Sequence, residues 1–186
     1  MKRIVGLLLS LLLLLAACSG GEDTMEQALR LRSDLQASGC AFDAVITADY
    51  GDVTYTFTLS CQTDKDGNLT FSVTDPASIA GITGKIDSGA GTLTFDDAAL
   101  SFAMLADGQL TPVSAPWVVV GALRGGYIIA SGADGEHTRL TVNDTYAEDA
   151  LTVDAWLTAE GTPVFAEIEW DNRRILSMEI KNFIIR

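Results

Sequence analysis

The side chains that most often perform acid, base or nucleophilic chemistry are few in this sequence, and none stands in a catalytic pattern. His137 is the single histidine, and it follows the turn Ala133-Asp134-Gly135 with no cysteine or serine motif beside it. A histidine-based triad or a zinc site needs a nucleophile or further ligands, and the sequence around His137 supplies none. We therefore expect His137 to be an exposed loop residue. The acidic pairs Asp96-Asp97 and Glu148-Asp149 lie in turn-like segments, where carboxylates commonly serve solvation. The separation of a glycosidase-type acid pair is a three-dimensional quantity, which stays open at this stage.

No Walker, Rossmann or nucleophile-elbow pattern is present. The residues Asp64, Asp66, Asn68 and Asp75 resemble a calcium loop only superficially. Glycine stands at the fourth position of that segment instead of the sixth, and the last ligand is not glutamate. We therefore expect no enzyme activity, no bound metal and no cofactor.

One cysteine near the start of the chain has a setting that predicts covalent chemistry. Met1-Lys2-Arg3 is cationic and residues 4–15 are apolar apart from Gly6 and Ser10, which is the layout of a secretory signal. Such a run is too short for a bilayer core, which takes about 20 helical residues. The signal ends in Leu15-Ala16-Ala17-Cys18, which resembles the lipobox of bacterial lipoproteins. We expect cleavage before Cys18 and a lipid on its thiol; an ordinary signal-region cysteine is the alternative.

Composition then bounds the rest of the chain. We predict a signal peptide over residues 1–17, a lipidated flexible tether over 18–23, and a single domain over 24–186. The precursor carries a formal charge of −13, and loss of Lys2 and Arg3 would leave 25 acidic against ten basic residues, or −15. Nucleic acid is a poor partner for that charge, because phosphate backbones are bound mainly by lysine and arginine. The expected location is outside the cytoplasm, anchored to the cell membrane or the outer membrane.

Cys40 and Cys61 remain for a compartment in which a disulfide can persist. Both stand in segments of alternating polar and apolar residues, which predict two half-buried strands joined near Tyr50-Gly51. A two-residue turn would place Cys40 opposite Cys61 in a non-hydrogen-bonded pair, within disulfide reach. Two free buried thiols are the competing interpretation.

Periodicity predicts mostly antiparallel strands with little helix. Residues 24–38 are expected to form an amphipathic helix, with Thr24 and Gln27 as a capping box and Gly39 as its stop. The segment 112–124 is apolar and bounded by prolines, which fits a short helix or lid, or a buried strand. Alternation predicts strands over the following ranges: 69–75, 127–131, 140–145, 151–158, 164–170 and 175–184. The fold class is thus mainly β with α, dominated by antiparallel hairpins.

Several segments together resemble the LolA/LolB-like lipoprotein carrier family, including its lipidated relatives of the GerS germination type. The resemblance rests on four stretches: Ala28-Leu29-Arg30, residues 76–84 (PASIAGITG), residues 91–96 (GTLTFD), and the end from Ala166 to Ile180. It implies a strongly curved antiparallel sheet, a half-barrel, covered by an N-terminal helix and a short central helix or lid. None of the matching motifs is catalytic.

The resemblance also implies that a hydrophobic ligand or a lipoprotein acyl chain binds in the concave face of the sheet. The residues expected to line such a cavity are Phe42, Ile46, Tyr55, Phe57, Leu59, Phe71, Phe95 and Trp117. Packing of these aromatics as an ordinary core is the alternative. Carriers of this family latch the lid with an arginine on an early strand, whereas this sequence has no arginine between Arg32 and Arg124. A second functional class is an interaction or structural lipoprotein of the envelope that binds a partner protein or dimerises without a lipid ligand.

Overall fold

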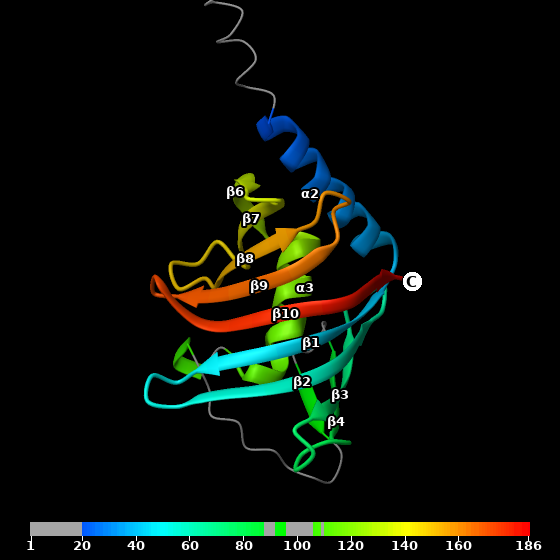
Figure 1. Cartoon of the computed structure of the whole chain (residues 1–186), viewed down its shortest axis with the longest axis vertical. Coiled ribbons are helices and arrows are strands. Elements are labelled where there is room, and N and C mark those ends of the chain that lie inside the picture. The colour runs from blue at the N-terminus through cyan, green and yellow to red at the C-terminus, as the bar shows by residue number, and fades with distance from the viewer. Residues whose placement is uncertain (1–19, 88–91, 96–105, 109) are drawn as a thin grey trace, which may run out of the picture.

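The computed structural model describes residues 20–87, 92–95, 106–108 and 110–186. Within these ranges ten strands form one antiparallel sheet in the order β5-β4-β3-β2-β1-β10-β9-β8-β7-β6. The sheet curves around two helices and stays open, with β5 and β6 at its two edges (Figure 1). The predicted class, mainly β with α and a half-barrel sheet, is confirmed.

The first half of the chain contains α2 (Gly20–Ala37), β1 (Cys40–Asp49), β2 (Thr54–Thr63), β3 (Leu69–Asp75), β4 (Thr83–Asp87) and β5 (Thr92–Phe95). The second half contains η2 (Ala106–Gly108), η3 (Pro112–Ser114), α3 (Ala115–Gly125), β6 (Tyr127–Asp134), β7 (His137–Asn143), β8 (Thr152–Leu157), β9 (Pro163–Trp170) and β10 (Arg173–Ile185). Every strand predicted from alternation is present, with ends that differ by up to three residues.

The N-terminal helix is longer than expected. It begins at Gly20, so residues 20–23 are helical and not the flexible tether that we predicted. Thr24 therefore does not cap the helix; its hydroxyl lies 3.3 Å from that of Ser131 on β6. The predicted apolar stripe is buried, and it consists of Ala28, Leu31 and Leu35.

The β1–β2 hairpin corrects the predicted register. The turn has four residues, closed by the bond from Tyr50 N–H to the Val53 carbonyl at 3.0 Å. The Gly51 N–H also donates to the Asp49 carboxylate at 2.7 Å within this turn. Phe42 consequently faces Cys61. Cys40 lies two residues before Phe42 on β1, so it does not face Cys61. A two-residue error keeps every side chain on its face, because side chains alternate with period two.

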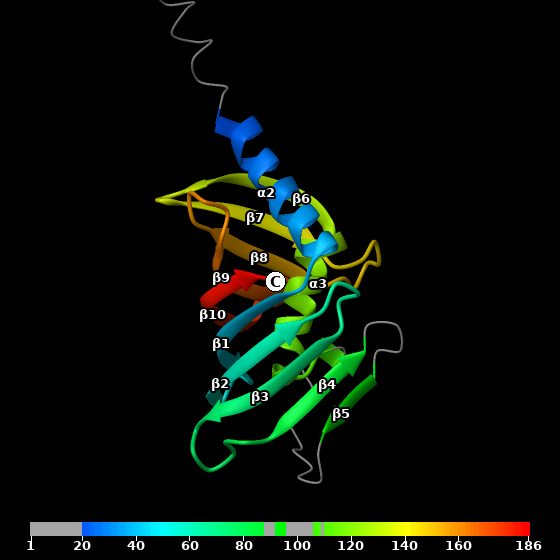
Figure 2. The same cartoon turned by 90° about the vertical axis from the view of Figure 1, so that its right-hand side faces the viewer.

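The segment after Pro112 is helical, so the buried-strand alternative is wrong. Pro116 occupies a first-turn position of α3, where its missing N–H leaves no bond unmade. Val118, Val119 and Val120 are all buried, together with Leu123. Figure 1 shows α3 behind β8, β9, β10 and β1, inside the curve of the sheet. Figure 2 shows α2 at the end of the sheet that carries β6 and β7.

We expect Gly39→Ala to destabilise the fold, because Gly39 joins α2 to β1 against the backbone of a neighbouring turn. A Cβ at this position would collide with the backbone carbonyl of Thr63, which cannot move as a side-chain tip can. The free energy of unfolding should fall by roughly 1–3 kcal/mol in denaturant titrations. Gly121→Ala is the matched control, since nothing lies within 4 Å of its Cβ position and alanine favours a helix by about 0.5–1 kcal/mol. Equal stability of Gly39→Ala and the parent would contradict the close approach.

Candidate functional site

The concave face of the sheet is filled by the protein's own side chains. Five of the residues predicted to line a cavity belong to one apolar core and are at most 4% exposed: Phe42, Ile46, Phe57, Leu59 and Phe71. Tyr55 is 56% exposed near the β1–β2 turn, where its ring meets that of Tyr50 edge-on, and Trp117 packs partly buried against the core. The side chain of Phe95 lies outside the described part of the chain. The structure thus brings most of the predicted set together, as core.

Two arginines hold the helices that close this face. Arg32 on α2 donates to the carbonyls of Leu123 at 3.0 Å and Gly126 at 2.8 Å, which are among the unpaired carbonyls that end α3. Arg124 on α3 donates in return to the Leu35 carbonyl on α2, and to the Lys65 carbonyl at 2.7 Å. Each helix therefore receives a cation at its C-terminal end, where the helix dipole favours one. These are the two arginines that flank the arginine-free stretch of the sequence.

An open groove of about 760 Å³ lies beside α2. Its walls come from α2, the β6–β7 turn, the β8–β9 turn and the end of β10. Gln27 fixes one wall by donating to the carbonyls of Thr158 at 2.8 Å and Ala159 at 2.9 Å. Among drug-sized and peptide sites this volume is ordinary, since ligand pockets measure about 300–1,000 Å³.

The groove is lined by apolar side chains and by more acidic than basic ones. Leu31, Phe183 and Ile185 contribute apolar surface, and Ile185 is 40% exposed. The ionisable lining residues are Arg30, Asp34, Glu136, His137 and Glu160. A hydrogen bond from the Thr158 side chain lowers the pKa of the Glu160 carboxyl. Three carboxylates against one arginine favour a cationic or amphipathic occupant.

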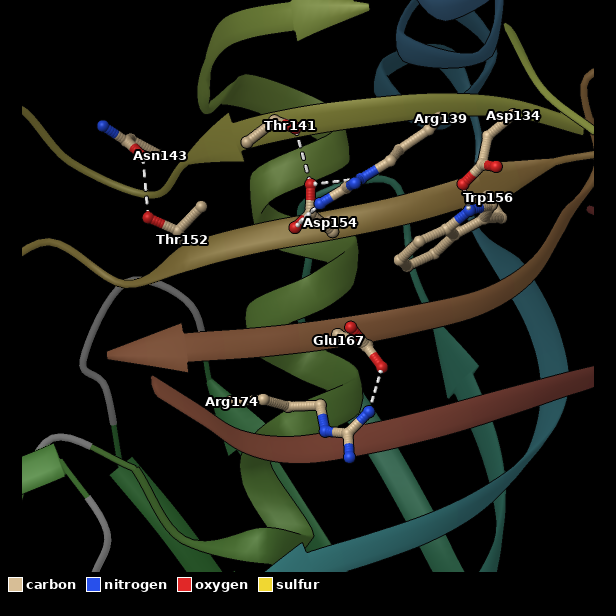
Figure 3. A network of polar contacts seen from close by, with 9 residues as sticks. All are labelled: Asp134, Arg139, Thr141, Asn143, Thr152, Asp154, Trp156, Glu167 and Arg174. Atoms are coloured by element: carbon tan, nitrogen blue, oxygen red, sulfur yellow. Dashed lines mark hydrogen bonds and ion pairs between the residues drawn. The ribbon is translucent and has the colours of Figure 1, made fainter. Parts of the chain in front are cut away.

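The outer face of β7 to β10 carries a polar network that sequence reasoning missed. Figure 3 shows its side chains on the side of the strands away from α3. Asp154 is 1% exposed, and it accepts bonds from Arg139 Nε at 3.1 Å, from Arg139 Nη2 at 2.7 Å and from the Thr141 hydroxyl at 2.5 Å. The hydrogen bonds to Asp154 raise the pKa of Arg139, whose guanidinium also lies 5.2 Å from the Trp156 ring. Each side-chain oxygen of Asp154 has a hydrogen-bond partner, so the role of this cluster is structural. We call Arg139, Thr141 and Asp154 the brace, because they join β7 to β8.

Two further contacts extend the brace. Trp156 donates its indole N–H to Asp134 at 2.8 Å, and Arg174 donates to Glu167 at 2.7 Å. The signal for these pairs was in principle readable, because polar residues alternate with apolar ones along β7 and β8. Which polar residues face each other depends on register, which the sequence does not display.

Cys40 and Cys61 are buried free thiols. The predicted disulfide depended on direct pairing, and the observed register makes the two residues diagonal neighbours instead. The Cys40 sulfur lies 3.1 Å from the Thr63 hydroxyl. Burial raises the pKa of both thiols, and for Cys61 the neighbouring Cys40 and Asp43 raise it further.

The described ranges contain neither a metal-binding cluster nor a membrane-spanning helix. No three histidine, cysteine, aspartate or glutamate residues there gather around a point that could hold a metal ion. In the same residues, no helix combines the length and the apolar character needed to cross a bilayer. His137, the one histidine, lies at the start of β7 on the rim of the groove.

No protein-family model and no curated protein sequence matches this chain. A solved LolA superfamily protein from Nitrosomonas europaea is similar, with 10% identity, coverage of 86% of this chain and 93% of that chain, and a TM-score of 0.40. A putative outer membrane lipoprotein-sorting domain from Vibrio parahaemolyticus has 7% identity, coverage of 89% and 93%, and a TM-score of 0.38. A chain in the structure of the MucA/MucB complex of Pseudomonas aeruginosa is also similar. Its identity is 8%, the match covers 88% of this chain and 57% of that chain, and the TM-score is 0.39.

The resemblance to LolA-like proteins that the sequence predicts is therefore found again among solved structures. This likeness concerns the backbone fold alone. With these identities and TM-scores, the likeness brings no function from those proteins to this one.

We expect both thiols to resist alkylation in the folded protein. A raised pKa lowers the fraction of reactive thiolate, so iodoacetamide at pH 8 should leave Cys40 and Cys61 unmodified. In guanidinium chloride without reductant, both should be alkylated at the rate of a free cysteine, which peptide mass spectrometry would report. Rapid labelling of the native chain would contradict the burial. Failure to label the unfolded chain would mean that the two sulfurs are bonded.

Proposed function

We propose that this protein is a lipid-anchored binding protein of the bacterial cell envelope, which holds a polypeptide partner in the groove beside α2. The observation that carries the proposal is the groove itself, an open space of about 760 Å³ lined by both apolar and acidic side chains. Grooves of this kind bind an amphipathic segment through its apolar side chains, while the charged rim selects its polar face.

The anchor supports this role by placing the groove near a membrane. Cys18 ends a lipobox-like signal, and α2 begins at Gly20. Two residues span at most about 7 Å, so a lipid on Cys18 would hold the first turn of α2 against the bilayer surface. Several acyl chains give stable attachment, since each buried CH₂ contributes about 0.8 kcal/mol. A partner within reach would then be another envelope protein outside the cytoplasm.

The kind of occupant follows from the lining. An acyl chain favours a wall that is almost wholly apolar, whereas this groove alternates Leu31 and Phe183 with charged and hydroxyl side chains. A polypeptide offers both apolar and charged groups at side-chain spacing. We therefore propose binding of a polypeptide as the role of the groove, whose lining combines apolar and charged side chains.

A second candidate function, binding of a hydrophobic ligand or acyl chain in the concave face, is favoured by the construction of α3. This helix covers the apolar inner face with three valines, and its polar contacts with α2 are made near its C-terminal end by Arg32, Gln36 and Arg124. Release of those contacts would let the helix tilt away and expose Phe42, Ile46 and Phe57. The concave face would then accept an apolar chain.

The anchor is tested by changing its one reactive atom. We expect the parent protein to fractionate with membranes and its N-terminal peptide to carry a diacylglyceryl thioether on Cys18 in mass spectrometry. Cys18→Ser should leave the membrane fraction, because serine has no thiol to take the lipid. A Cys40→Ser variant is the control and should stay membrane-bound. An unmodified Cys18 in the membrane-purified protein would refute the anchor.

The groove is tested by site-specific photo-crosslinking in the native envelope. A photoreactive residue at Glu160, on the rim, should give a discrete protein adduct, and one at Asp52, in the turn at the other end of the sheet, should not. Ala159→Trp places a large side chain in the groove from an exposed position. It should lower the yield of the adduct at position 160 at least tenfold. Equal adducts at positions 160 and 52 would contradict the groove. Co-purified lipid that Arg32→Ala releases, without any adduct, would favour the second candidate instead.

A further inference from the structure

The turn between β2 and β3 contains a sequence motif to which neither the groove nor the lipid anchor gives a role. Asn68-Leu69-Thr70 has the pattern in which an asparagine amide is joined to a glycan in exported proteins. Bacterial enzymes of this class also select a carboxylate two positions before the asparagine, where it can pair with a cationic group of the enzyme. Asp66 stands at that position, so residues 66–70 match the longer pattern.

A second asparagine provides a comparison within the same chain. Asn143-Asp144-Thr145 has the three-residue pattern, but Thr141 stands two positions before the asparagine and carries no charge. Asn143 ends β7, which pairs with β6 on one side and with β8 on the other. Its side-chain oxygen accepts from the Thr152 hydroxyl at 3.1 Å. We therefore expect Asn68, in a turn and with an acidic residue before it, to be the preferred acceptor.

The Asp64 carboxylate organises the turn that carries Asn68. Its Oδ1 accepts from the backbone N–H of Asp66 at 2.9 Å and from that of Asn68 at 3.0 Å. Its Oδ2 accepts from Asn68 Nδ2 at 2.8 Å. A primary amide nitrogen has two hydrogens, and a glycosidic bond replaces one of them. The remaining N–H can still donate to Asp64, so a glycan on Asn68 is compatible with this turn.

Alternation along β3 directs the Asn68 side chain away from the helices. Leu69 and Phe71 are buried on the inner face of the sheet, and Thr70 between them is exposed on the outer face. The Asn68 carbonyl accepts from the Asp64 N–H at 3.1 Å, which continues the β2–β3 pairing by one residue pair. Asn68 thus shares the outer face with Thr70, on the side of the sheet opposite α3.

The outer face beside Asn68 has an open hollow of about 590 Å³ whose lining suits a glycan. Its outward-facing hydroxyl and amide side chains come from β2, β3 and β4, and they are Ser60, Gln62, Thr70, Ser72 and Thr83. Such neutral groups both donate and accept hydrogen bonds, as the hydroxyl groups of a sugar require. The charged residues in the described part of the lining are Lys85 and Arg186, and Lys85 is paired with Asp87 at 2.5 Å. Thr70 stands two residues from Asn68, which is about 7 Å along a strand.

We propose that Asn68 is an acceptor for N-linked glycosylation during export, and that the attached glycan lies on this hollow of the outer face. In the reaction Asn68 Nδ2 forms a bond to the anomeric carbon of an oligosaccharide carried on a polyisoprenyl pyrophosphate. The bond from that carbon to the pyrophosphate oxygen breaks, the lipid pyrophosphate leaves with the electron pair, and one amide proton passes to a base of the enzyme. Transfer during export precedes the bond from Asn68 to Asp64. The proposal requires export of the chain and is independent of the groove.

The test follows the full chain in its native envelope and in a bacterial host that carries an oligosaccharyltransferase with a lipid-linked oligosaccharide of known mass. Trypsin separates the two motifs, because Asn68 lies in fragment 66–85 and Asn143 in fragment 140–173. We expect mass spectrometry to find a glycan on fragment 66–85 in both settings, with fragment 140–173 unmodified. Absence of a glycan from Asn68 in either setting, or equal occupancy of the two fragments, would overturn the proposal.

Matched variants separate the motif from simple exposure of the turn. Thr70→Val removes the hydroxyl and keeps a β-branched side chain, and it should lower the occupancy of Asn68 at least tenfold. Thr70→Ser retains the hydroxyl and should stay modified. Asp66→Asn removes the charge and should also lower the occupancy at least tenfold. Circular dichroism checks that each variant folds, and unchanged occupancy in Thr70→Val or Asp66→Asn would contradict the assignment.

The place of the glycan is tested by comparing amide resonances of the glycosylated chain with those of the unmodified parent. Contact with the hollow should shift the resonances of Ser60, Ser72 and Thr83, and it should leave those of β8 unchanged. Shifts confined to residues 64–70 would show that the glycan extends into solvent, and they would overturn its placement on the hollow.

Discussion

A curved sheet exposes one apolar face to its own hollow, and covering that face is the constraint on which this structure depends. The inner side chains of β1, β2, β8, β9 and β10 form a continuous core, and α3 closes it with a run of valines. Burial at about 25 cal/mol per Å² of apolar surface makes an empty hollow costly. Either a ligand or the chain itself must fill it, and in this structure the chain does.

The cover determines where open space remains. Since α3 occupies the hollow, α2 is displaced to the end of the sheet near β6 and β7, where it contacts α3 through Arg32 and Arg124. The groove is the gap left between α2 and the loops at that end. One helix thus does three things: it packs a stripe into the core, holds the C-terminal end of α3, and forms one wall of the groove.

The distribution of charge restricts which ligands the groove could bind. The outer face is braced by Arg139 and Asp154, whose bonding capacity is used within the sheet. The ionisable residues that line the groove include three carboxylates and one arginine, and this negative charge opposes the binding of polyanions.

Much of this fold could be predicted from the sequence, because period-two alternation is a local pattern. The strands, the amphipathic helix, the acidic charge and the candidate lipid site at Cys18 all follow from neighbouring residues. Local patterns also placed Phe42, Ile46, Phe57 and Leu59 on one face, and they are buried together as expected.

Only the tertiary structure decided what that face contacts and which residues meet across strands. The four-residue turn at Tyr50 shifted the register by two, which separated Cys40 from Cys61 yet left every face unchanged. The hollow was expected to hold a ligand, but whether a helix fills it depends on the packing of α3 against strands distant in sequence. The pairing of Arg139 with Asp154 and the groove beside α2 arise in the same way. A single chain specifies its periodicity directly, whereas register and packing are settled by contacts between residues that the sequence keeps far apart.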